Sequence, residues 1–246
     1  MRWLWRWGIA DRQTAGTIWG VGRSATFASI AAMKKLGLIE DARISGMPSP
    51  VLHMTPVGAN LVEQYMPDDW REIKPVIYSS RINAGQVQHD LLVQKMVLKI
   101  KADDYKNDRY YRRFPAHFFY KGGKIPDAVV FIKGQKIAIE VIENLPRPEE
   151  QKRLLWLYAE AHYKKRLNSV IFASTNPALL KRLKITAKNG CGVWSYNSAQ
   201  RRWYNIDSGK PQGDLRDFVD TNFINNAVRF RDLSEYTKSL YQVLIK

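Results

Sequence analysis

Cysteine is nearly absent from this sequence of 246 residues, and the single Cys191 excludes an intrachain disulfide or a cysteine-rich zinc site. No apolar run reaches the ~18 residues that a membrane-spanning helix needs. The apolar part of the N-terminal segment is too short for a signal peptide, and no small-residue cleavage site follows it. We therefore expect no membrane insertion and a cytoplasmic location.

Acidic residues are scarce, because 23 Asp and Glu stand against 39 Lys and Arg, for a net charge of +16. This balance predicts an anionic polymer as the partner, which indicates nucleic acid. The excess is uneven: residues 1–70 hold 7 basic and 6 acidic side chains, and the remainder holds 32 and 17. A basic surface around a few acids is typical of a nuclease, whose surface attracts phosphates while the acids hold a metal ion.

Two acids in the basic part occupy matching places in a predicted β-hairpin. Apolar, β-branched runs at 125–132 and 135–141 flank the break at Lys133-Gly134, which indicates two strands joined by a two-residue turn. In the register that such a turn imposes, Asp127 lies opposite Glu140, with the Cβ atoms roughly 5 Å apart. The sequence therefore predicts two carboxylates side by side on one face of a sheet.

Carboxylates at that spacing repel each other unless a cation lies between them. Apolar residues alternate on both faces of these strands, which predicts burial on both sides and makes compensation of the charge necessary. Mg²⁺ and Mn²⁺ usually take one or two carboxylates together with phosphate and water. We therefore predict that Asp127 and Glu140 bind Mg²⁺ or Mn²⁺ for phosphodiester cleavage. The alternative is an ordinary surface hairpin with two unrelated acids.

Helix and turn signals divide the chain into residues 1–70, a linker at 71–85, and a second domain at 86–246. The first part shows helix, helix, helix, hairpin, helix. Its signals include Asp11 as a helix cap and Thr55-Pro56 at the start of the last helix. Two short helices joined by a Gly-containing turn and followed by a hairpin predict a winged helix-turn-helix that binds DNA.

The predicted recognition helix covers residues 25–35, with Ser24 as its cap and Gly37 as its end. Four side chains should face the major groove, and one should contact DNA from the wing: Arg23, Thr26, Ser29 and Lys34, and then Arg43. Because this part is nearly neutral, a small helical dimerisation or scaffold domain is the alternative.

The second domain opens with a predicted helix at 87–102, followed by a strand at 110–120 and the acidic hairpin. A helix at 148–165 and a short buried strand at 170–173 come next. A last helix follows at residues 177–188, and its basic side chains are predicted to contact the DNA backbone: Lys181, Arg182, Lys184 and Lys188.

Pro126-Asp127, twelve intervening positions and then Glu140-Val141-Ile142 resemble the PD-(D/E)xK nuclease motif. The resemblance implies that the aspartate and the glutamate bind Mg²⁺ or Mn²⁺. Its lysine, which polarises the attacking water, is missing, because Ile142 stands at that place. Some members move this lysine to the following helix, which makes Lys152 the nearest candidate. The order α-β-β-β-α-β is that of restriction-endonuclease-like nucleases, so the expected fold is α/β (α+β), a winged helix followed by this core.

Two further residues are candidates at the same site. Glu143 would be an extra metal ligand if the strand bulges after Glu140. His89 lies on the apolar stripe of its helix, where a core histidine is one interpretation. In the other interpretation His89 or Asp90 adds to the metal site, and a neutral imidazole could accept a proton from water.

The winged-helix head, the segment His89-Asp90-Leu91-Leu92-Val93 and the acidic motif together resemble the MobC class of plasmid mobilization relaxases over nearly the whole chain. The resemblance implies a bacterial, plasmid-encoded enzyme that nicks DNA at a transfer origin and works with a coupling protein. Hydrolysis and covalent transesterification both remain open. The alternatives are a resolvase-like or restriction-like nuclease, or a DNA-binding regulator with a degenerate nuclease domain, which the missing lysine favours.

Overall fold

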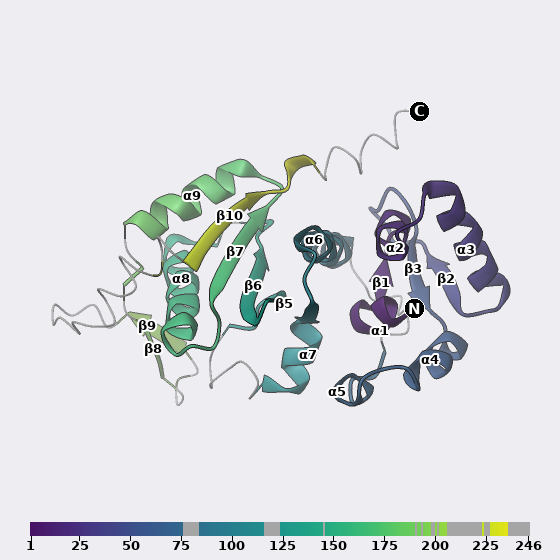
Figure 1. The fold of residues 1–246 in the computed structure, drawn as a ribbon. Helices are drawn as coiled ribbons and strands as arrows, with labels where there is room; N and C mark the ends of the chain where they lie inside the picture. Colours follow the sequence, from purple (N-terminus) through teal and green to yellow (C-terminus); the bar gives the residue numbers. More distant parts are fainter. Residues whose placement is uncertain are drawn as a thin grey trace. The chain divides into compact units, whose positions relative to one another are not determined.

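The computed structural model describes residues 1–75, 84–115, 124–144, 146–189 and 227–235, with the short pieces 191–192, 194–197, 200, 202–205 and 223. These residues form a mixed α/β protein with two compact units, which we call the first unit and the second unit (Figure 1). The division falls between Lys101 and Ala102. Among the described helices, none is both long and apolar enough to cross a membrane.

The first unit contains a three-stranded antiparallel sheet of order β1-β3-β2. Its strands are β1 (Ile9–Ala10), β2 (Ile39–Ala42) and β3 (Val51–Met54). Its helices up to residue 71 are α1 (Arg2–Trp7), α2 (Arg12–Trp19), α3 (Arg23–Lys35), α4 (Pro56–Glu63) and α5 (Asp68–Arg71). The predicted order of three helices, a hairpin and a helix is confirmed, whereas β1 and α5 were not predicted.

Capping residues fix some of these helix ends. The Asp11 side chain accepts a hydrogen bond from the Thr14 amide at 2.6 Å, and Thr55 caps α4 in the same way. Gly20 ends α2 in the left-handed conformation that glycine favours. The prediction that Ser24 caps α3 is wrong, because the helix begins two residues earlier, at Arg23, and its N-cap is Gly22.

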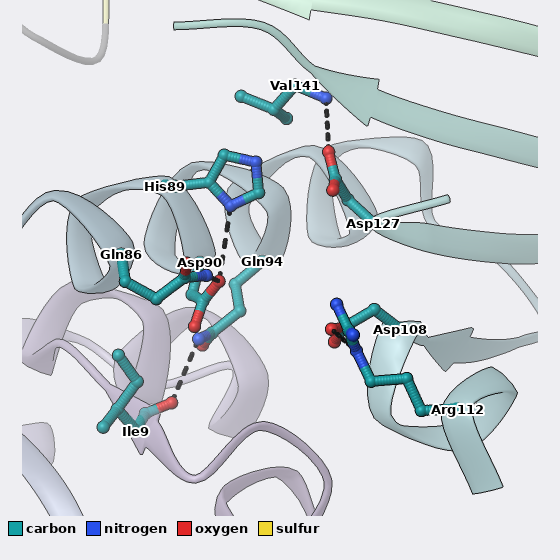
Figure 2. A network of polar contacts seen from close by, with 9 residues as sticks. All are labelled: Ile9, Gln86, His89, Asp90, Gln94, Asp108, Arg112, Asp127 and Val141. Atoms are coloured by element: carbon teal, nitrogen blue, oxygen red, sulfur yellow. Dashed lines mark hydrogen bonds and ion pairs between the residues drawn. The ribbon is translucent and has the colours of Figure 1, made fainter. Parts of the chain in front are cut away.

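The long helix α6 (Ala84–Ile100) belongs to the first unit, although the sequence placed it at the start of the second domain. Val87 and Leu91 of α6 join a buried cluster with Ile9 and Val51 of the sheet. The Gln94 side chain donates to the Ile9 carbonyl oxygen at 3.0 Å (Figure 2). These contacts explain why the boundary follows α6 and does not fall within residues 71–85.

The second unit contains a five-stranded mixed sheet of order β10-β7-β6-β5-β4. Its strands are β4 (Asp104–Asn107), β5 (Ala128–Ile132), β6 (Gln135–Val141), β7 (Ser169–Ser174) and β10 (Val228–Asp232). The three strands β4, β5 and β6 are antiparallel, whereas β7 runs parallel to β6 and to β10. The remaining elements are α7 (Asp108–Arg113), α8 (Pro148–Tyr163), α9 (Pro177–Lys188), and the two-stranded pair β8 (Trp194–Asn197) and β9 (Arg202–Asn205).

Aromatic contacts show which face of this sheet the helices cover. Tyr158 of α8 packs edge-on against Phe172 of β7, and Lys184 of α9 lies over the ring of Phe230 in β10. Phe172 pairs in register with Phe230 on one side and with Glu140 on the other, so all three side chains point to the same face. Glu140 therefore faces α8, and the Tyr158 hydroxyl of that helix contacts it.

The predicted strand at 110–120 is wrong where the structure describes it. Residues 104–107 form the strand, and the chain then enters α7, whose N-cap Asn107 accepts a hydrogen bond from the Tyr110 amide. Residues 116–120 lie outside the described residues. The run of aromatic and basic residues suggested a strand, but Tyr110 and Tyr111 belong to the helix α7, and both are buried.

Candidate active site

The hairpin that carries the two acids has the predicted register. Lys133 and Gly134 both have positive φ, at 48° and 79°, as a two-residue turn between twisted strands requires. Ile132 pairs with Gln135, and the pairing continues to the start of β5. The regular pairing ends at Ala128 and Ile139, because the Asp127 amide donates to the Ile139 carbonyl oxygen at 3.1 Å, one residue out of that register. Asp127 therefore precedes the first regular pair, and its carboxylate is close enough for its charge to raise the pKa of Glu140.

Asp127 is held by the backbone of the neighbouring strand. Its Oδ2 accepts a hydrogen bond from the Val141 amide at 2.7 Å (Figure 2). Its carbonyl oxygen accepts another from the Asp108 amide at 3.1 Å. These bonds fix the Asp127 carboxylate at the edge of the β5–β6 pair, next to the end of β6.

Glu140 is almost completely buried, with 5% of its surface exposed. Its Oε2 accepts a hydrogen bond from the Tyr158 hydroxyl at 2.6 Å, and its Oε1 lies 2.8 Å from the Lys124 ammonium. Burial raises the pKa of Glu140 to about 7, and the nearby charge of Asp127 adds to this rise. Lys124 and Tyr158 act in the opposite direction, because both stabilise the ionised carboxylate.

Lys124 supplies the cation that the carboxylate pair needs. Burial alone would lower its pKa, but the charges of Glu140 and Asp127 and the hydrogen bond to Glu140 raise it overall. Its side chain is 36% exposed, so the ammonium lies where the site meets solvent. Sequence analysis missed Lys124 because it precedes the strand and stands outside the expected motif. It also missed Tyr158.

The structure does not bring Lys152 to the carboxylates. Six residues separate it from Tyr158 on α8, which turns it roughly 120° away around the helix. Within the described part of the chain, Lys152 forms no ion pair or hydrogen bond with Asp127 or Glu140. Its predicted role as the compensating cation is therefore not supported, and Lys124 is the cation that pairs with Glu140. Ile142 is buried, and its amide donates to the Ala173 carbonyl oxygen.

Glu143 is bound elsewhere. Its carboxylate accepts hydrogen bonds from the Thr175 hydroxyl at 3.1 and 3.3 Å, just after β7. Among the residues that the structure describes, no group of three His, Cys, Asp or Glu side chains is suited to hold a metal ion. The strand does not bulge to turn Glu143 toward Glu140, so a third ligand from this position is not supported.

His89 lies on α6 and therefore belongs to the first unit, whereas the carboxylates belong to the second. Its side chain is one-quarter exposed, and Nδ1 lies 3.3 Å from the Asp90 carboxylate (Figure 2). Gln86 also donates to this carboxylate, at 2.7 Å. A role of His89 in the chemistry stays a prediction.

The predicted DNA contacts of the first unit differ in exposure. Arg23 and Arg43 are exposed, and Ser29 is half-buried. Lys34 is paired with the Asp41 carboxylate. Thr26 is 4% exposed, and its hydroxyl donates to the Gly22 carbonyl oxygen. It packs against Gly16 of α2, so the prediction that it faces the major groove is wrong.

In the second unit, the predicted contacts on α9 are all exposed and follow one basic helix surface: Lys181, Arg182, Lys184 and Lys188.

A further basic side chain lies beside the carboxylates. Arg112 of α7 pairs with Asp108 at 2.9 Å, and the Asp108 amide is bonded to Asp127 (Figure 2). The acids are thus bordered by cations on α7 and at Lys124.

Comparison of the chain with protein-family models, with curated proteins and with solved structures finds no match. The interpretation of the site therefore depends on its own geometry. Two carboxylate oxygens facing one cation can bind a divalent metal, and a nearby lysine can bind an anion such as phosphate.

Proposed function

We propose that this protein is a metal-dependent DNA-nicking endonuclease of the relaxase type, which starts plasmid mobilization at a transfer origin. The observation that carries the proposal is that Asp127 lies close enough to the buried Glu140 to raise its pKa, with Lys124 bonded to Glu140. This is the chemistry of the PD-(D/E)xK motif with its lysine supplied from a different position. The net charge of +16 supports a nucleic acid substrate.

The arrangement of elements supports the same assignment. From β4 to β7 the chain forms a strand, the helix α7, two further antiparallel strands, the helix α8 and a parallel strand, which apart from α7 is the order of a restriction-endonuclease-like core. The helices and the antiparallel strands of the first unit support a winged helix-turn-helix. We assign duplex recognition to the first unit and strand cleavage to the second. A bacterial cytoplasm and a coupling protein as partner complete the proposal.

The donor set fits Mg²⁺ or Mn²⁺, because two carboxylates lie close enough for one to raise the pKa of the other, and Glu140 binds an ammonium group. Asp127 and Glu140 would hold the ion, which would supply an activated water and neutralise phosphate charge. The Val141 amide and the Tyr158 hydroxyl orient the two carboxylates. Lys124 is the residue placed to bind the scissile phosphate, where it stabilises the charge that grows in the transition state.

Incubation with supercoiled plasmid that carries a transfer origin tests the proposal, with Mg²⁺ or Mn²⁺ present and open circles as the readout. Asp127→Asn and Glu140→Gln should abolish nicking, while Glu149→Gln, a change in the first turn of α8, serves as the matched control. Lys124→Met should lower the rate about 10²–10³-fold, whereas Lys152→Met should change it little. Scoring with and without protease separates hydrolysis from a covalent enzyme–DNA bond. Nicking at the normal rate by either acid variant would contradict the proposal.

A regulator that binds DNA without cutting it is the second candidate. Ile142 at the usual lysine position and the absence of a three-ligand cluster among the described residues favour it. In that case Lys124 and the carboxylates form a structural ion pair. Sequence-specific binding with no cleavage under either metal would establish the regulator. Cutting of both strands of relaxed DNA would instead indicate a resolvase-like or restriction-like nuclease.

A further inference from the structure

A groove of about 770 Å³ opens in the first unit, and none of its lining residues belongs to the candidate active site. It lies between α2, the start of α3 and the segment that precedes β3. The side chains that matter for its chemistry are Arg12, Arg23 and Phe27, with Pro48 and Pro50 on the opposite wall. Most of the lining is apolar, so the groove differs from an ordinary polar surface depression.

Phe27 is an exposed aromatic ring with two cations near it. The ring is 41% exposed. The Arg12 guanidinium lies 5.1 Å from its centre, and the Arg23 guanidinium lies 5.7 Å from it. Guanidinium groups at these distances are attracted to the ring face and hold it in place. The ring is thus a fixed flat surface inside a groove that has room for a planar ligand.

The charges that line the groove favour an anion. Asp11 is the acid in its lining, and its carboxylate is engaged by the Thr14 amide and by Lys95 at 3.3 Å. Arg12 lies 3.5 Å from Asp41, a contact too long for strong pairing. Among the described residues, Arg23 has no acidic partner. The groove therefore offers positive charge next to an aromatic ring.

We propose that this groove binds a short unpaired DNA segment, with a base stacked on Phe27 and phosphates on Arg23 and Arg12. Stacking on an aromatic ring beside a basic rim is the usual way in which proteins hold a single strand. A duplex backbone fits less well, because proline walls offer no donors to its phosphates. This inference rests on the proposed function for its ligand, DNA, and it adds a site for single-stranded DNA in the first unit.

The test uses the full-length protein and a short single-stranded oligodeoxynucleotide that carries 5-iodouracil, which photocrosslinks to a stacked aromatic ring. The cross-link should map to the peptide that contains Phe27, and the matching duplex should give much less of it. Phe27→Ala should abolish it, and Arg23→Gln should lower its yield several-fold. The matched controls on the same helix are Leu36→Ala, for an exposed apolar residue, and Lys35→Gln, for an exposed cation. Both should keep the yield.

Affinity measured by fluorescence anisotropy completes the test. Phe27→Ala should weaken single-strand binding about tenfold relative to Leu36→Ala, as expected for the loss of one stacked base. Phe27→Trp should keep or strengthen binding, which guards against a variant that merely unfolds. A cross-link outside the groove, or an equal yield from duplex, would overturn the inference. The cross-linking and anisotropy measurements omit divalent metal, so their outcome does not depend on whether the nicking assay succeeds.

Discussion

Replacing Lys124 with methionine tests whether its ammonium compensates the buried carboxylates. The change keeps the length of the side chain and removes the positive charge 2.8 Å from Glu140. Removing one partner of a buried ion pair costs about 3–5 kcal/mol of unfolding free energy. Lys124 is 36% exposed, so solvent screening reduces this figure, and we expect about 1–2 kcal/mol at pH 8.

The loss should depend on pH in a defined direction. Burial and Asp127 raise the pKa of Glu140 to about 7 in the folded protein, from an ordinary value of 4.5. The stability from this rise is therefore complete below about pH 4.5 and disappears as pH increases through 7. Near pH 5, Glu140 is protonated with or without Lys124, so the ion pair contributes little. The difference between Lys124→Met and the wild type should thus be largest at pH 8 and small at pH 5.

Urea unfolding of the full chain at both pH values measures this difference, in a cycle of the wild type, Lys124→Met, Glu140→Gln and the double variant. In the Glu140→Gln background, the lysine substitution should cost much less at pH 8, because its charged partner is gone. An equal loss at both pH values, or the same loss in the Gln background, would show that Lys124 does not act through Glu140.

Three further outcomes are expected. Tyr158→Phe should lower the unfolding free energy by about 1–3 kcal/mol at pH 8, because Glu140 loses a hydrogen bond, and urea unfolding checks this. Gly58→Ala should cost at least about 2 kcal/mol in the same assay, since a Cβ would lie 2.0 Å from the Leu38 carbonyl oxygen, whereas Gly22→Ala meets nothing and is the control. Neutralising three α9 cations should weaken DNA binding and lower its salt slope by about 2–3 in a titration; they are Lys181, Lys184 and Lys188.

Local signals predicted the hairpin and most helix ends correctly. The two-residue turn at Lys133 and Gly134 sets the register of both strands, and the alternation of apolar residues sets the buried faces. Caps such as Asp11 act within one helical turn, so a sequence shows them directly. Each of these features depends on neighbours only a few residues away in the chain.

Features that depend on distant packing were not predicted correctly. The sequence predicted that Thr26 of α3 faces DNA, yet the buried side chains of this helix are Thr26 and Ile30. Thr26 lies against Gly16, a contact that the helical period alone does not indicate. The sequence predicted that the helix α6 starts a second domain, but its apolar side chains pack against β1 and the rest of the sheet in the first unit.

The candidate site combines both cases. The sequence predicted that two buried carboxylates need a cation, because their facing positions follow from a turn and a register. Which cation supplies this charge depends on a side chain that reaches in from outside the strands. The search for a lysine along β6 and α8 led to Lys152, because the motif fixes spacing in sequence. In the structure, the cation paired with Glu140 is Lys124, which belongs to the segment before β5. A motif lacking its lysine is therefore better tested by the charge balance of the folded site than by its spacing.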